Sequence, residues 1–178
     1  MKVHPKKRMW AWLLLLGGVS VPLSYVHGLV THPEAREGLW GGIPEALKPL
    51  YSVSMILAAA GFFLFTGFIF FRVDPEERNA RFTVFPLLYA LILIPSALWL
   101  PLTFAVMEHT STLLWWAVRV DLLLVGLGSI GLFPALFAFR PRKRDLFFTL
   151  ALLGLTFFCL QTLVLDALVW PYFFSKGS

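Results

Sequence analysis

The chain has 178 residues, of which 58% are hydrophobic and only 14% are charged. Soluble domains usually carry about 25% charged residues, so the composition excludes an ordinary soluble globular protein. The net charge of +5 would suit a nucleic-acid partner, but the basic residues form short clusters between long apolar runs, which indicates a membrane topology and no nucleic-acid groove. At this length we expect one membrane domain over residues 1–178.

Five apolar segments are long enough to cross a bilayer as helices, which takes about 20 mostly apolar residues each. The first follows a basic N-terminus, as a secretory signal does, but its apolar run is too long and no clear cleavage site follows, so we expect a retained helix. The connections are short, so we expect sequential helices to pack antiparallel. The predicted fold is an all-α, polytopic membrane protein, a five-transmembrane-helix bundle with helices at residues 10–30, 50–71, 83–107, 113–139 and 146–173.

The basic residues predict the orientation of this bundle, because cytoplasmic loops of membrane proteins are enriched in Lys and Arg. Arg36, Lys48 and Lys176 fall on one side, and Arg119 lies within a helix. The remaining eleven fall on the side of the N-terminus: Lys2, Lys6, Lys7, Arg8, Arg72, Arg78, Arg81, Arg140, Arg142, Lys143 and Arg144. With five crossings, the N-terminus is predicted on the cytoplasm-like side and the C-terminus on the other, in a bacterial inner membrane or an organelle membrane.

The long connection at residues 31–49 is expected at the outer end of the bundle. Pro33 followed by Glu34 is typical of a helix start, and Gly41–Gly42 is typical of a helix stop. We therefore expect a short interfacial helix that carries Trp40 and lies over the bundle, either as a lid or only as a connector.

Three charged residues interrupt the fourth and fifth helices. In hydrocarbon each costs at least about 2.5–3.5 kcal/mol, so such side chains usually face the bundle interior and have a partner. Arg119, Asp121 and Asp166 all fall in the outer third of their helices, and we expect Arg119 to pair with Asp166. Asp121 would then face His27 or His109. The layer is either an ion pair that only fixes helix packing or part of a site for ligand binding or proton handling.

Most of the helices also carry a stripe of polar, small or aromatic residues at helical spacing. Such stripes either line a sparsely polar cavity for a small molecule or let the helices pack closely. Prolines in the third helix bend it, which favours open space inside the bundle. The stripes are Ser20, Ser24 and His27; Tyr51, Met55, Ala58 and Ala59; Tyr89, Ile92, Ser96, Trp99 and Thr103; and Cys159, Thr162, Asp166 and Trp170.

Aromatic residues near the helix ends are expected to anchor the bundle at the membrane interfaces. They are Trp10 and Trp12 on the inner side, and Trp115, Trp116, Trp170 and Tyr172 on the outer side. The histidine spacing matches no metal motif, and we expect no metal site. The single cysteine, Cys159, allows no disulfide within the chain. No nucleotide-binding loop or nucleophile elbow is present.

Two stretches resemble the translocator protein family, also called the tryptophan-rich sensory proteins (TspO/MBR). Residues 49–55, Pro-Leu-Tyr-Ser-Val-Ser-Met, lead into residues 58–61 and are similar to the opening of the family's second helix. Residues 96–104, Ser-Ala-Leu-Trp-Leu-Pro-Leu-Thr-Phe, are similar to its third-helix pattern. The resemblance implies an apolar pocket beneath the first loop for tetrapyrroles, such as porphyrin or haem, or for sterol-like ligands. It also implies that Tyr51 and Trp99 line this pocket.

We predict a protein that binds or transports a hydrophobic or amphipathic small ligand, tetrapyrrole- or sterol-like, in preference to an enzyme. One alternative is a non-catalytic accessory subunit of a larger membrane complex. Another is a membrane enzyme that acts on a lipid or sterol, with Asp121, Asp166 or His27 handling protons. Assembly as a homodimer or within a larger complex stays open. The residues expected at the ligand site are Tyr51, Trp99, Thr103, Arg119, Asp121, Asp166, His27 and Trp40.

Overall fold

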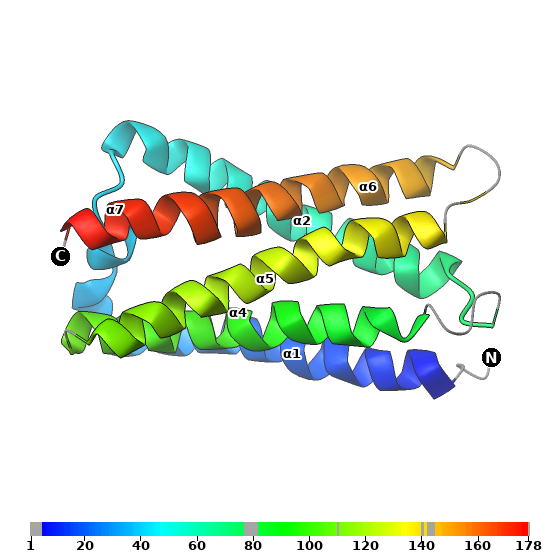
Figure 1. Cartoon of the computed structure of the whole chain (residues 1–178), viewed down its shortest axis with the longest axis horizontal. Coiled ribbons are helices and arrows are strands. Elements are labelled where there is room, and N and C mark those ends of the chain that lie inside the picture. The colour runs from blue at the N-terminus through cyan, green and yellow to red at the C-terminus, as the bar shows by residue number, and fades with distance from the viewer. Residues whose placement is uncertain (1–4, 77–81, 110, 140, 142–144, 178) are drawn as a thin grey trace.

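The computed structural model describes residues 5–76, 82–109, 111–139, 141 and 145–177. Within these ranges all regular structure is helical, and five helical rods are long and apolar enough to span a membrane, as predicted. Most rod ends lie within a few residues of the predicted ones. The rods are α1 (Pro5–Thr31), α2 (Lys48–Arg72), α4 (Val84–Glu108), α5 (Thr112–Ala138) and a fifth rod made of α6 (Leu146–Cys159), a π-helix (Leu160–Val169) and α7 (Trp170–Gly177) (Figure 1).

The connection between α1 and α2 forms three short 3₁₀ turns, at Pro33–Ala35, Glu37–Trp40 and Glu45–Leu47. The helical stretch therefore begins at Pro33 and stops at Gly41, as predicted, although it is 3₁₀ and is broken at Arg36. Gly41 has φ +56°, a left-handed conformation that favours glycine. The turns lie at the same end of the bundle as α7, and we call this the loop end (Figure 1).

The opposite end of the bundle is where α1 begins and α2 ends. Arg72 closes α2 there, with its guanidinium 4.7 Å from the centroid of the Phe147 ring. Several basic residues that predict the orientation lie outside the described residues: Lys2, Arg78, Arg81, Arg140, Arg142, Lys143 and Arg144.

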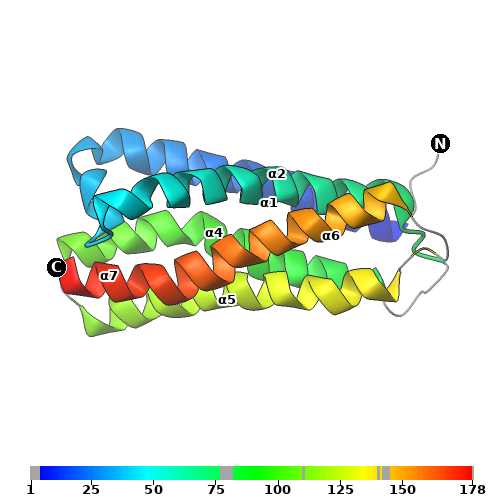
Figure 2. The same cartoon turned by 90° about the horizontal axis from the view of Figure 1, so that it is seen from above.

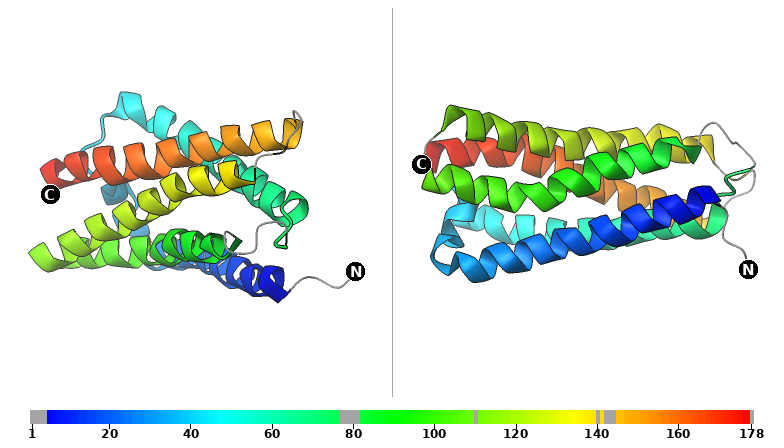
Figure 3. Two further views of the ribbon diagram at one scale, coloured as in Figure 1. Left: turned by 45° about the vertical axis from the view of Figure 1, so that its right-hand side comes forward. Right: turned by 90° about the horizontal axis from the view of Figure 1, so that it is seen from below.

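The order of the helices in space differs from their order in the chain. α1 lies along α4 and runs in the same direction, α4 packs against α5, α5 against the fifth rod, and the fifth rod against α2 (Figures 2 and 3). The α4–α5 and α5–α6 pairs are antiparallel neighbours, as predicted. The prediction is wrong for the α1–α2 and α2–α4 pairs, which do not pack along each other. The long connection after α1 lets α2 reach α6, and α1 takes the place beside α4.

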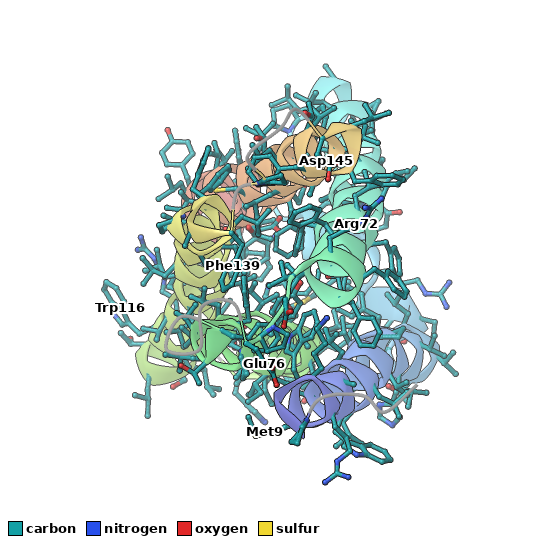
Figure 4. All side chains as sticks on the ribbon, turned by 90° about the vertical axis from the view of Figure 1, so that its right-hand side faces the viewer. Met9, Arg72, Glu76, Trp116, Phe139 and Asp145 are labelled. Carbon is teal, nitrogen blue, oxygen red and sulfur yellow. The ribbon has the colours of Figure 1, made fainter. Side chains whose placement is uncertain are left out.

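Trp10 holds the helices together at the opposite end. It is fully buried, with its ring centroid 5.9 Å from that of Phe70 on α2 and 5.2 Å from that of Tyr89 on α4. Looking along the bundle from this end, the neighbouring Met9 lies on the outer surface (Figure 4). The interpretation of Trp10 as an interfacial anchor is therefore wrong, since the face of α1 that Trp10 occupies is turned toward α2 and α4. Trp12 is 58% exposed and fits that role.

The backbones of α2 and α6 approach each other closely at two glycines. A Cβ atom added to Gly154 would lie 2.8 Å from Gly61 Cα, and one added to Gly61 would meet the Gly154 carbonyl oxygen. Small residues at such crossings let membrane helices gain backbone packing that larger side chains prevent. The crossing fixes α2 against the fifth rod.

We expect Gly61→Ala to lower the free energy of unfolding by about 1–3 kcal/mol, the usual result of overpacking a close contact. Gly67→Ala is the matched control on the same helix, because a Cβ there meets nothing within 4 Å. Unfolding by sodium dodecyl sulfate in mixed micelles, followed by circular dichroism, measures both variants. Equal stability of the two would contradict the close crossing.

Candidate functional site

The π-helix at Leu160–Val169 determines which side chains meet near the loop end. Its backbone hydrogen bonds join residues five apart, and short π-helical stretches occur often at functional sites. Gln161 and Asp166 are five apart, and Gln161 Nε2 donates to Asp166 Oδ1 at 2.7 Å. In an α-helix the two side chains would point about 140° apart. The π-helix therefore places an amide directly beside this carboxyl.

Asp121 on α5 is the second carboxyl of this region, and only 6% of the residue is exposed. Among the described residues its Oδ2 atom has no hydrogen-bond partner. Gly128 lies against Ile92 of α4, and continuing that antiparallel register toward the loop end brings Trp99 level with Asp121. Trp99 Nε1 is likewise buried without a partner. Two unpaired polar atoms therefore lie at the same level of neighbouring helices.

The predicted ion pair between Arg119 and Asp166 is wrong. Among the described side chains no ion pair joins them, and the Arg119 guanidinium lies 5.0 Å from the centroid of the Trp116 ring. Trp116 is 53% exposed and points away from the bundle (Figure 4). Positions 119 and 121 are about 200° apart around a helix, so burying Asp121 turns Arg119 outward.

Tyr25 on α1 packs against Trp99, the residue that lies level with Asp121, with ring centroids 5.6 Å apart. Tyr51 of α2 reaches the π-helix next to Asp166, because its hydroxyl donates to the Leu165 carbonyl at 3.3 Å. We call Tyr25, Tyr51, Asp121, Gln161 and Asp166 the polar layer.

An aromatic cluster lies between the polar layer and the loop end. The ring centroid of Trp170 is 5.8 Å from that of Trp99 and 4.5 Å from that of Phe174. Trp115 stacks on Phe174 at 5.6 Å. Trp170 is buried, so its prediction as an interfacial anchor is wrong, whereas Trp115 is half-buried and packs with one side on Phe174. We call Trp99, Trp115, Trp170 and Phe174 the aromatic cluster.

The α1–α2 connection is attached to α7 by two hydrogen bonds. Trp170 Nε1 donates to the Leu39 carbonyl at 2.9 Å, and the Gly42 amide donates to the Phe173 carbonyl at 3.2 Å. A Cβ atom on Gly41 would lie 2.7 Å from Phe174 Cα, so only glycine allows this approach. The connection is thus a cover closely fitted to the end of the fifth rod.

The other predicted site residues fall in different places. Trp40 of the connection packs edge-on against Tyr51, with ring centroids 6.4 Å apart, and both lie near the polar layer. Thr103 is buried, but its hydroxyl donates to the Trp99 carbonyl at 2.8 Å within its own helix. His27 and His109 are exposed, so the prediction that one of them faces Asp121 is wrong.

Sequence reasoning missed Tyr25, Gln161 and Ser54. Gly17 and Gly28 contact α4 closely, and Ser24 Oγ donates to the Ala97 carbonyl at 2.7 Å. These small residues mark the face of α1 beside which Tyr25 lies, and they are the signal that could have found it. Ser54 is 6% exposed and its Oγ has no partner. No sequence signal identifies the π-helix that positions Gln161.

Comparisons with models of protein families, with curated proteins and with solved structures find no match to this chain. In the described part of the chain, no three His, Cys, Asp or Glu side chains gather as metal ligands would. The arrangement itself therefore carries the functional argument: two carboxyls in an aromatic setting, beneath a covering connection.

We expect Gln161→Leu and Asp166→Leu to be coupled by about 0.5–3 kcal/mol in the free energy of unfolding, because their side chains share a hydrogen bond. The effects of Arg119→Leu and Asp166→Leu should add within about 0.5 kcal/mol, because these two side chains form no ion pair with each other. Both double-mutant cycles are measured by unfolding in mixed micelles. Strong coupling between the Arg119 and Asp166 substitutions would show that the two side chains interact, and it would contradict the packing described above.

Proposed function

We propose that this chain is a multi-pass membrane protein that binds a hydrophobic or amphipathic small molecule in the loop-end half of its bundle. The observation that carries the proposal is the set of buried polar atoms without partners among aromatic rings, above all Asp121 Oδ2 and Trp99 Nε1. Ligand sites commonly combine aromatic and apolar walls with a few polar groups that fix orientation.

Packing alone gives a poor account of these polar atoms. A buried polar group without a hydrogen bond is costly, typically by about 1–3 kcal/mol from protein mutational data. Other buried hydroxyls of the bundle do have partners, as Ser129 and Thr162 do: Thr162 Oγ1 donates to Ser129 Oγ at 3.1 Å, and Ser129 Oγ donates to the Gly126 carbonyl. A ligand that supplied the missing donors and acceptors would remove this cost.

The helix arrangement supports entry of such a ligand from the bilayer. α1 and α2 do not pack along each other, so separating them near the loop end would break few contacts. Tyr25 and Tyr51 come from these two helices, and Trp40 covers Tyr51 from the connection. Tetrapyrrole- and sterol-like molecules, which the sequence resemblance implies, are candidates of suitable apolar character.

We expect purified protein in uncharged micelles to bind 1-pyrenebutanol, a neutral polycyclic probe, saturably and above the level of empty micelles. Trp99→Leu should weaken this binding about two- to tenfold, because an aromatic contact is worth about 0.5–1.5 kcal/mol. Trp116→Leu is the matched control, since Trp116 faces outward. Pyrene emission excited through tryptophan reports binding, and protoporphyrin is titrated in parallel as a tetrapyrrole.

Failure of both probes to bind above empty micelles would count against a ligand of these two classes. Equal affinities of the Trp99→Leu and Trp116→Leu variants would place the binding elsewhere in the bundle. Absence of binding, together with copurification of other membrane proteins, would favour the accessory-subunit alternative.

The proposed orientation places the loop end outside the cytoplasm, from the basic residues at the other end. We expect a cysteine at Glu45, on the exposed connection, to react with a membrane-impermeant maleimide in intact bacterial cells that express the chain in a Cys159→Ala background. A cysteine at Asp74, beyond α2, should react only after the cells are opened. The reverse pattern would contradict the orientation.

A further inference from the structure

The polar layer contains two carboxyls but no described cation. The described basic side chains near the loop end contact other groups: Arg36 donates to the Leu29 carbonyl at 2.8 Å, Lys48 pairs with Glu45 at 2.6 Å, and Arg119 lies over Trp116. Asp121 and Asp166 therefore have no positive partner among the described side chains. Burying a carboxylate without one carries an effective penalty of several kcal/mol per ion.

Gln161 supplies a second, independent sign of a missing partner. Only 4% of it is exposed, and its amide points at Asp166, to which Nε2 donates. The remaining Oε1 is buried and has no partner among the residues that the structure describes. Gln161 Oε1 and Asp121 Oδ2 are both unpartnered acceptors, so they call for a group that donates hydrogen bonds or carries positive charge.

Aromatic rings lie at the level of the Asp121 acceptor. Trp99 is level with Asp121 in the α4–α5 register, and it packs against Tyr25 and Trp170. Rings of tryptophan and tyrosine attract cations through their π faces, and aromatic residues recognise ammonium groups in many ligand sites. Carboxyls, unpartnered acceptors and aromatic faces all favour a positively charged ligand group.

We propose that the polar layer selects a cationic amphiphile, a lipophilic amine or quaternary ammonium compound. Its charge lies between Asp121 and Asp166, and its apolar body packs on Tyr25 and Trp99. This inference rests on the proposed function and specifies the ligand's head group. A ligand with carboxylate groups, as porphyrins have, meets repulsion from the same two side chains.

Three pyrene probes of equal apolar bulk test the head group: 4-(1-pyrenyl)butyltrimethylammonium, 1-pyrenebutanol and 1-pyrenebutyrate. Each is titrated into the full-length protein in uncharged micelles, and its partition into empty micelles is subtracted. We expect the ammonium probe to bind about tenfold more tightly than the alcohol, as about 1.4 kcal/mol of added attraction gives. The butyrate should bind most weakly.

Two isosteric variants test the residues. Asp121→Asn and Asp166→Asn should each reduce the preference for ammonium over alcohol at least threefold while leaving alcohol binding within about twofold, because only the charge is removed. Glu34→Gln, on the exposed connection, is the control and should change nothing. The comparison of head groups in the unmodified protein needs no variant, so it decides the question even if both variants misfold.

The outcomes separate this inference from the proposed function. Equal binding of the ammonium and alcohol probes would overturn the cation selectivity and leave a ligand site in place. Tightest binding of the butyrate would also overturn it. Binding of no probe above empty micelles would overturn both the selectivity and the proposed function.

Discussion

The structure depends on one constraint: a polar group inside a membrane bundle must find its partner in the protein, because lipid offers none. Most described hydroxyls on the helices meet it within their own helix. Ser20, Thr103 and Thr156 each donate to the carbonyl four residues earlier. Hydrogen bonds between helices are fewer, and they occur at a few levels of the bundle. One joins Thr66 and Tyr89 at 2.7 Å, and another joins Thr162 and Ser129.

The polar atoms that break this constraint are unevenly distributed. Trp10 Nε1 is the case at the opposite end, where four aromatic rings enclose the indole. The other cases in the described residues are Ser54, Trp99, Asp121 and Gln161, all on the side of the bundle toward the loop end. Gly61 lies against Gly154, and Ser54 and Gln161 are each seven residues further toward the loop end, so this antiparallel register places them at the same level. These four unpartnered groups therefore lie in one region of the bundle, its loop-end half.

The helices could be predicted from the sequence because apolar length alone decides whether a segment can span a bilayer. The burial of Asp121 followed from the same cost of exposing charge to lipid. What could not be predicted was the direction of each side chain. The prediction of an Arg119–Asp166 pair was wrong because the sequence gives the depth and charge of each residue but not the direction in which each helix turns its side chains. The predictions for Trp10 and Trp170 were wrong for the same reason, since a tryptophan near a helix end can face the interface or the interior.

The π-helix was beyond prediction for a different reason. It depends on how the fifth rod packs against α5, where Gly126 contacts Leu163 and Thr162 reaches Ser129. These contacts hold the first turn of the π-helix, while Tyr51 and the connection hold its far end through Leu165 and Trp170. The π-helix, which is wider than an α-helix, accommodates the residues between these two attached ends. This wider winding turns Gln161 toward Asp166.

The two ends of the bundle are therefore stabilised by different interactions. The opposite end packs Trp10 against Phe70, Phe82, Phe85 and Tyr89, and the α2–α6 crossing at Gly61 fixes the fifth rod. Close packing there stabilises the fold mainly through dispersion contacts among rings and backbones, with the Thr66–Tyr89 hydrogen bond and the bond from Lys7 Nζ to the Phe70 carbonyl added to them. The loop end is held instead by a few hydrogen bonds from the connection to α7. A bundle stabilised at one end can tolerate an unpartnered carboxyl oxygen, that of Asp121, at the other, and that tolerance is the condition under which a buried binding site can exist.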